Sequence, residues 1–376
     1  MKTSQRPARW FALPLTLISF IALLFPAALL AQPERSVPAN GIWAKQGPSP
    51  ATGGQIENVI PDDEVVGAIE AVVTHPSDAD IIYVGGVNAG IWKTENATDL
   101  RPNWDSLTDE FQSLSIGSLD MDPTDVTHQT LVAGIGRFSS YLFEGGGRIG
   151  LLRTTDGGAN WTVIDGGGAM VGRNVAAVAA RGSTIVAAVN TADAFTFGEI
   201  GIWRSTDGGA TFTQISSGDG SATGLPGGVT HDIGRDRSNP ARLFTSVIFA
   251  DNVGGVNGIY RSTNTGATWT KVSTPEVDSF ITNSTVNVEF SVSGDTVYVG
   301  MIGIPGSTQA PDTGALAAVF RSGDGGDSWE SMGVPTTIED GVAVGASPGG
   351  QGSRHFSIQA DPQDNSTVYV GGDRQP

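Results

Sequence analysis

The sequence predicts an all-β protein folded as a β-propeller of four-stranded antiparallel blades. A motif of about twelve residues recurs along the chain, and the aromatic residues that close its copies, Trp161, Phe212, Trp269 and Trp329, are spaced by 51, 57 and 60 residues. Between the copies lie short segments in which apolar and polar residues alternate, as in half-buried strands. Four short strands in a repeat of about 40–60 residues are typical of a propeller blade.

The repeated motif is easily followed along the sequence. Its copies are GLLRTTDGGANW at 150–161, GIWRSTDGGATF at 201–212, GIYRSTNTGATW at 258–269 and AVFRSGDGGDSW at 318–329, with a degenerate copy, GIWKTENATDLRPNW, at 90–104. Each copy begins with residues that predict the third strand of a blade, and a fourth strand is expected to start at the closing aromatic residue. Before each copy, two apolar segments flank a turn such as HPSD or DPTD, which predicts strands one and two.

These elements predict five full blades and a partial sixth. The expected boundaries are 66–107, 116–164, 175–215, 229–273 and 285–333, with the partial blade at 353–376, so that the propeller as a whole covers 66–376. The sixth unit contains only strands one and two. Two interpretations follow: the chain is a fragment of a longer protein, which we favour, or the segment NGIWAKQGP at 40–48 returns to complete a blade. Residues 32–65 are accordingly expected to lead into the propeller or to close it.

The amino-terminus predicts export. Lys2, Arg6 and Arg9 precede an uncharged apolar run at 11–31, so residues 1–31 are interpreted as a signal peptide cleaved after Ala31. An uncleaved membrane anchor is the alternative, since the run is long enough to span a bilayer. The chain has no cysteine, which excludes disulfides and thiol chemistry. Its formal charge of −18 argues against nucleic acid and anionic membranes as partners.

The motif Ser-x-Asp-x-Gly-x-x-x-Trp between two strands resembles the Asp-box, or BNR repeat, of the sialidase-like, sortilin-like and xyloglucanase-like propellers. The Asp or Asn side chain is expected to accept hydrogen bonds across the turn, the Gly to take a positive-φ corner, and the aromatic ring to pack beneath the hairpin. The resemblance therefore implies a structural role for these residues, away from any ligand site. The residues assigned to this role are Asn96, Asp156, Trp161, Asp207, Phe212, Asn264, Trp269, Asp324 and Trp329.

The resemblance alone does not choose a function, because these propellers include hydrolases, receptors and assembly factors. Sialidases use an arginine triad, a Tyr–Glu nucleophile pair and an Arg-Ile-Pro element. The Arg-Ile-Pro element is absent from this chain. The xyloglucan-cleaving hydrolases carry a TDVGG-like segment after the third strand of the first blade, where this chain has KTENAT. Both departures weaken an enzymatic interpretation, whereas a binding module requires no catalytic motif.

Long connections between strands two and three offer candidate site residues, because propeller ligands usually bind at that face. The carboxylates that could serve as general acid and base are Glu144, Asp193, Glu199 and Asp312. The candidates for ligand contact are Arg137, Tyr141, Phe143, Arg148, Phe195 and Phe197. No metal site or cofactor is expected, since the four histidines lack ligand spacing and no phosphate-binding loop is present.

The sequence thus predicts an exported Asp-box propeller, secreted, periplasmic or at the cell surface, that binds a glycan or an extracellular protein. The alternative is a glycoside hydrolase of xyloglucanase-like or sialidase-like type that uses the loop carboxylates. The expected partners are a polysaccharide or an extracellular protein, without nucleic acid and without membrane insertion once the signal is removed.

Overall fold

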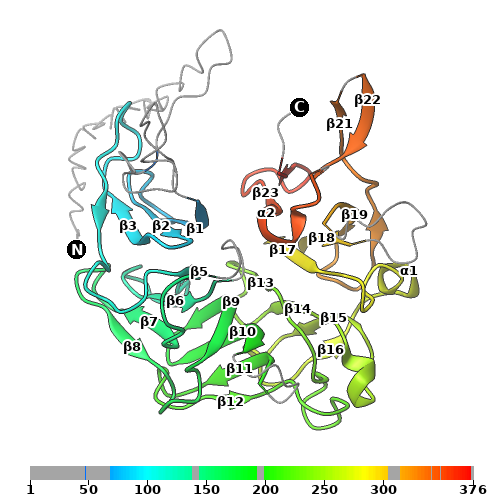
Figure 1. Cartoon of the computed structure of the whole chain (residues 1–376), viewed down its shortest axis with the longest axis horizontal. Coiled ribbons are helices and arrows are strands. Elements are labelled where there is room, and N and C mark those ends of the chain that lie inside the picture. The colour runs from blue at the N-terminus through cyan, green and yellow to red at the C-terminus, as the bar shows by residue number, and fades with distance from the viewer. Residues whose placement is uncertain are drawn as a thin grey trace, which may run out of the picture. The chain divides into compact units, whose positions relative to one another are not determined.

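Five four-stranded antiparallel sheets follow one another along the chain (Figure 1). The computed structural model describes residues 47, 68–137, 144–192, 199–303, 314–339, 341–347 and 349–373, all within the unit Gln46–Pro376. The strands of the five sheets are β1 (Ile69–Thr74), β2 (Ile82–Gly86), β3 (Gly90–Thr94) and β4 (Asp105–Ser106); β5 (Ile116–Met121), β6 (Leu131–Ile135), β7 (Leu151–Thr154) and β8 (Thr162–Ile164); β9 (Arg173–Arg181), β10 (Thr184–Ala192), β11 (Gly201–Ser205) and β12 (Thr213–Gln214); β13 (Ile233–Arg235), β14 (Leu243–Val247), β15 (Gly258–Ser262) and β16 (Thr270–Lys271); and β17 (Asn287–Ser293), β18 (Thr296–Ile302), β19 (Leu316–Ser322) and β20 (Glu330–Ser331).

Two smaller sheets and three short helices complete the described part of the chain. The hairpin of β21 (Thr336–Glu339) and β22 (Val342–Gly345) lies between the predicted fifth blade, 285–333, and the predicted partial blade, 353–376. The last sheet pairs β23 (Ser357–Ala360) with β24 (Val368–Gly371). The helices are η2 (Ala250–Val253), α1 (Pro275–Asp278) and α2 (Gly352–His355).

Within the described residues, none of the helices has the length and apolarity that crossing a membrane would require. The apolar run at 11–31, interpreted from the sequence as a signal peptide, lies outside the described residues, and so does nearly all of the segment 32–65.

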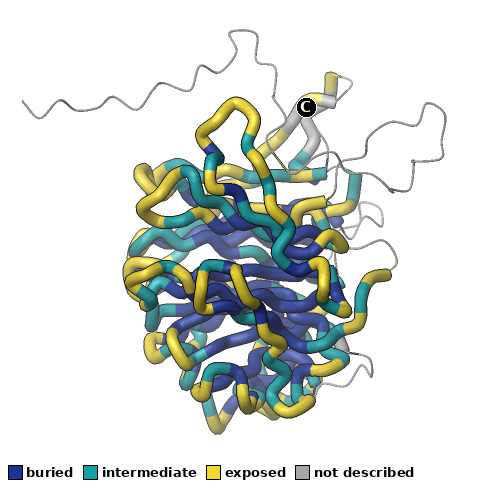
Figure 2. The backbone as a smooth tube through the Cα atoms, turned by 90° about the vertical axis from the view of Figure 1, so that its left-hand side faces the viewer, coloured by how far each residue is buried: buried dark blue, intermediate teal, exposed yellow. Residues whose placement is uncertain are grey.

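The first strand of each sheet packs against the sheets that precede and follow it. Contacts join β1 to β5, β5 to β9, β9 to β13, β13 to β17 and β17 to β23. In Figure 1 these strands lie toward the middle, whereas β8, β12 and β16 lie at the outside. Figure 2 shows the same order in burial, with buried strands in the interior and exposed turns at the surface. The core therefore lies between sheets, and each sheet depends on its neighbours for burial.

Glycines allow two neighbouring sheets to approach closely. A Cβ atom at Gly117, on β5, would lie 2.4 Å from the carbonyl oxygen of Val175, and one at Gly136 would lie 2.5 Å from the same oxygen. Val175 belongs to β9, the first strand of the next sheet. Any larger residue at either position would have to push the two backbones apart, which explains the glycines in an otherwise apolar pattern.

The repeated turn has the same hydrogen bonds in successive sheets. Ser205 Oγ donates to Asp207 Oδ1 over 2.7 Å and accepts from the backbone N–H of Gly209 over 2.9 Å. The same Asp207 oxygen accepts the backbone N–H of Thr211, also over 2.9 Å. Gly209 takes a φ of 97°. Equivalent bonds form around Asp156, Asn264 and Asp324, and Asn96 accepts the N–H of Asn103 in the longer copy.

The aromatic residue that closes each turn packs into the core beneath its hairpin. Trp161, Phe212 and Trp269 are all buried, and Trp329 is partly buried against the apolar cluster that contains Phe212. The Trp269 ring also donates its N–H to the carbonyl of Gly266 over 3.1 Å. The outer strands begin one residue later than the sequence suggested, at Thr162, Thr213, Thr270 and Glu330, because the aromatic residue itself ends the turn.

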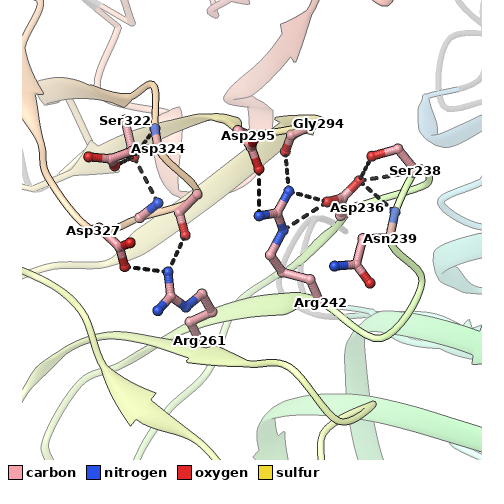
Figure 3. Close-up of polar contacts among 12 residues, drawn as sticks. Asp236, Ser238, Asn239, Arg242, Arg261, Gly294, Asp295, Ser322, Asp324 and Asp327 are labelled. Carbon is pink, nitrogen blue, oxygen red and sulfur yellow. Dashed lines mark hydrogen bonds and ion pairs between the residues drawn. The ribbon is translucent and has the colours of Figure 1, made fainter.

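Two of the arginines that precede the repeated turns, Arg204 and Arg261, link adjacent sheets. Arg204 donates to the carbonyl of Thr265, in the turn of the next sheet, over 2.8 Å. Figure 3 shows the corresponding contact of Arg261, which donates to the carbonyl of Gly325 and to Asp327, each over 2.7 Å. In these two copies the repeat thus supplies both the hairpin and a bond from one sheet to the next.

A second ion-pair network joins the β13–β16 sheet to the β17–β20 sheet. Arg242 binds the buried carboxylate of Asp236 through Nε over 2.8 Å and reaches Asp295 over 2.7 Å (Figure 3). Its Nη2 also donates to the carbonyl of Gly294 over 2.8 Å. The fork of the guanidinium therefore spans two turns on different sheets, a geometry that lysine could not reproduce.

Candidate functional site

The β6–β7 connection holds three of the predicted site residues that the structure describes, Arg137, Glu144 and Arg148. The backbone N–H of Arg137 donates to Asn174 Oδ1 over 2.5 Å, and Asn174 in turn donates to Asn190 over 2.8 Å. Both asparagines are buried at the end of the sheet where β9 begins and β10 ends. The next sheet therefore positions the start of this connection.

The second half of the connection rests on the preceding sheet. Asn88, between β2 and β3, donates to the backbone carbonyl of Glu144 over 3.3 Å and accepts from Ser115 over 2.6 Å. The Ser115 hydroxyl oxygen accepts the N–H of Gly146 over 2.9 Å. Glu144 is exposed at this edge. The main chain at Glu144 and Gly146 is thus held by Asn88 and Ser115, which lie far away in sequence.

Arg137 and Arg148 lie close enough for their charges to interact. Burial lowers the pKa of Arg148, and the positive charge of Arg137 lowers it further. Arg137 Nη1 donates to the carbonyl of Gly145 over 3.4 Å. Two neighbouring guanidinium groups beside an exposed carboxylate could contact the hydroxyl or carboxylate oxygens of a ligand.

Glu199 lies near a cationic group of its own sheet, Arg173 at the start of β9. Burial lowers the pKa of Arg173, and the charge of Glu199 opposes this effect. The Arg173 guanidinium stacks over the ring of Trp203, 4.3 Å from its centroid. Glu199 therefore lies within electrostatic reach of an arginine that is itself fixed on an aromatic face.

The structure places the described candidates in equivalent connections of adjacent sheets, Glu144 between β6 and β7 and Glu199 between β10 and β11. The remaining candidates lie outside the described residues: Asp193, Asp312, Tyr141, Phe143, Phe195 and Phe197. Their roles stay predictions. Among the residues with described positions, no group of three or more His, Asp or Glu side chains could hold a metal ion.

Sequence reasoning missed a pair of carboxyl groups between β13 and β17. Asp232 and Glu289 are hydrogen-bonded to each other, and burial raises the pKa of both. Asp232 accepts the backbone N–H of Phe290 over 2.8 Å and that of Ile233 over 2.7 Å. The sequence carried a signal for each residue: Asp232 directly precedes the first strand β13, and Glu289 lies within the largely apolar first strand β17.

The neighbourhood of this pair is buried and polar. Burial lowers the pKa of His231 to about 4, so its imidazole is neutral at pH 7. The buried hydroxyl of Thr230 has no hydrogen-bond partner among the described residues. Two carboxyl groups in hydrogen-bond contact are closer than the roughly 5 Å or more that separates glycosidase carboxylates. The two carboxyl groups are therefore expected to share one proton and so to link the two sheets. Their spacing does not match that of a catalytic carboxylate pair in a glycosidase.

Comparisons with known proteins point to one group of enzymes. No protein-family model matches the chain. The chain is 24% identical over 338 residues to a xyloglucanase of Hypocrea jecorina, covering 71% of this chain and 38% of that protein. It is 27% identical over 229 residues to a xyloglucanase of a Paenibacillus species, covering 55% of this chain and 21% of that protein. The chain thus spans well under half the length of these relatives.

Solved structures agree on the architecture. The GH74 enzyme of Niastella koreensis aligns with a TM-score of 0.52 and 18% identity, over 82% of this chain and 41% of that one. The GH74 xyloglucanase of Xanthomonas campestris aligns with a TM-score of 0.50 and 17% identity, over 82% of this chain and 42% of that one. The fold class predicted from the sequence is therefore confirmed, and the chain has the antiparallel β-propeller architecture of GH74 enzymes.

Proposed function

We propose that this chain is part of an exported glycoside-hydrolase-like protein that acts on a polysaccharide of the xyloglucan type. The similarity to xyloglucanases over as much as 71% of the chain carries the proposal. The composition is compatible with it, since a chain of charge −18 suits a neutral glycan better than a polyanion. Export follows from the interpretation of residues 1–31 as a signal peptide.

The glycan is proposed to lie across the edge where the first strand of each sheet begins. The β6–β7 and β10–β11 connections leave their sheets at this edge, because Ile116 at the start of β5 pairs with Ile135 at the end of β6. Arg137 and Arg148 would contact sugar oxygens there. Aromatic rings of the two connections, Tyr141, Phe143, Phe195 and Phe197, would stack on sugar faces.

Hydrolysis requires two carboxyl groups, one protonated as general acid and one ionised as base or nucleophile. The proposal assigns these roles within the set Glu144, Asp193, Glu199 and Asp312. Asp232 and Glu289 are excluded from the roles by their mutual contact.

Reducing-sugar release from xyloglucan by the full chain tests the proposal. We expect turnover, and a loss of about 100-fold or more when the general acid or base is replaced by its amide. The variants are Glu144→Gln, Asp193→Asn, Glu199→Gln and Asp312→Asn, singly and together. Glu330→Gln, on the exposed outer strand β20, is the matched control and should leave the rate unchanged. An unchanged rate in the fourfold variant would refute the assignment.

A binding module is the second candidate function. The neighbouring guanidinium groups of Arg137 and Arg148 favour it, because they can contact sugar oxygens without a catalytic carboxylate. This function predicts saturable retention of the chain on immobilised xyloglucan without release of reducing sugar. Absence of both turnover and retention would contradict the two candidates together.

A further inference from the structure

We propose that Arg181, Arg235 and Arg237 form a binding site for a small oxyanion, such as a phosphate or a sugar carboxylate. The three arginines lie where first strands of successive sheets end: Arg181 is the last residue of β9, Arg235 is the last of β13, and Arg237 follows two residues later. Asp120, one residue before the end of β5, lies among them. This end of the strands is opposite to the connections in which the glycan site is proposed.

The arginines converge on the Asp120 carboxylate. Arg181 Nη1 donates to Asp120 Oδ2 over 2.9 Å, and the backbone N–H of Ala180 donates to the same oxygen over 3.0 Å. The other oxygen, Oδ1, is 3.7 Å from Arg235 Nη1 and 3.7 Å from Arg237 Nη2. Oδ2 is thus directly bonded, whereas the two longer distances are ion pairs without direct hydrogen bonds.

The cluster has more donors than acceptors. The Arg181 side chain is only 2% exposed, yet its Nη2 has no hydrogen-bond partner among the described residues. Arg235 uses Nη1 for the carbonyls of Leu119 and Val178, over 3.3 Å and 3.0 Å. For Arg237, the ion pair with Asp120 is the contact found within the described part of the chain. Buried donors are normally satisfied, so an unfilled donor set beside a charged cluster indicates a missing acceptor.

The charges point to the same conclusion. Three guanidinium groups face the carboxylate of Asp120 and, on the side of Arg235, the carboxyl group of Asp232. Burial lowers the pKa of Arg237, Asp120 opposes this, and the charges of Arg235 and Arg181 lower the pKa further. The cluster therefore holds an excess of positive charge in a protein whose net charge is −18. An oxyanion would supply both the negative charge and the acceptors.

Access and chemistry suggest how the ligand binds. The side chains of Arg237 and Arg235 are 50% and 30% exposed, so an anion can reach both from solvent. The fork of each guanidinium matches the paired oxygens of a carboxylate or a phosphate. A phosphate and a sugar carboxylate share this oxyanion chemistry, and the experiment below distinguishes between them.

Isothermal titration calorimetry of the full chain at low ionic strength, with sodium phosphate in one arm and sodium glucuronate in the other, tests the site. We expect saturable binding of one anion per chain. Tighter binding of phosphate would identify a phosphate group as the ligand, and tighter binding of glucuronate would identify a sugar acid. Arg237→Gln should weaken binding about tenfold or more, because it removes charge-assisted hydrogen bonds to the anion.

A matched variant controls for non-specific charge effects. Arg321→Gln removes the same charge at a surface pair with Glu330 and should leave the affinity unchanged. Arg237 is half exposed, so its replacement should not unfold the chain, and circular dichroism checks this. Failure of both anions to saturate, or equal affinity in the Arg237→Gln variant, would overturn the proposal.

Discussion

Replacing Asp120 by alanine is expected to destabilise the propeller strongly. The Asp120 and Arg181 side chains are each 2% exposed, and their ion pair spans 2.9 Å between two neighbouring sheets. Without the carboxylate, the buried guanidinium keeps its bonds to the carbonyls of Pro240 and Ala180 but loses its counter-charge. The N–H of Ala180 loses its acceptor as well. Breaking a buried pair on one side costs about 3–5 kcal/mol.

Urea denaturation followed by tryptophan fluorescence measures this effect as a change in the free energy of unfolding. Glu330→Ala is the control, because it breaks a surface pair in which the glutamate side chain is 68% exposed, and it should cost at most about 1 kcal/mol. In the double variant Asp120→Ala/Arg181→Met, removal of both charges should recover part of the loss. Equal, small losses for Asp120→Ala and Glu330→Ala would refute the reasoning.

Three further predictions concern pH and backbone geometry. The pKa of Glu289 is raised above its ordinary 4.5, so its stabilising contribution is full below pH 4.5 and is lost as the pH rises through the folded value. The difference in unfolding free energy between the native chain and Glu289→Gln, measured in urea at pH 5 and pH 8, should therefore be smaller at pH 8. A constant difference would argue against the shared proton. Asp207 behaves in the opposite way, because hydrogen bonds from Thr211 and Ser205 lower its pKa to about 2. Its contribution to stability is therefore present above pH 3.8 and disappears as the pH falls toward 2. An acid titration of Asp207→Asn should lack this loss of stability. Gly209→Ala should destabilise the chain more than Gly167→Ala. Both glycines have a positive φ, but a Cβ at Gly209 would lie 2.7 Å from Ile164 Cδ1, whereas a Cβ at Gly167 would have no neighbour within 4 Å. Thermal melting of the two variants checks this, and equal melting temperatures would count against the steric argument.

Part of the candidate site could be predicted from the sequence. Glu144 and Arg148 stand four residues apart in one connection, so their proximity follows from the chain itself. The support of that connection by Asn88 depends on which turns adjoin across sheets. The approach of Glu199 to Arg173 depends on strand pairing within one sheet, which places the starts of β9 and β11 at the same edge. A local sequence pattern cannot predict such contacts. The alternation of apolar residues indicates where strands lie, but it does not indicate which side chains meet the polar residues at the strand ends.

The sequence alone was sufficient for the repeated hairpins and hence for the fold class. The bonds among Ser205, Asp207 and Gly209 join residues at most four positions apart, so local chemistry specifies them without reference to the rest of the chain. The pairs Asp120–Arg181 and Asp232–Glu289 join residues about 60 positions apart, one sheet to the next. Only the packing of first strands from successive sheets brings these charges together, because burial and charge balance are properties of the assembled interior. The tertiary structure therefore decided where the ionisable centres of this protein lie.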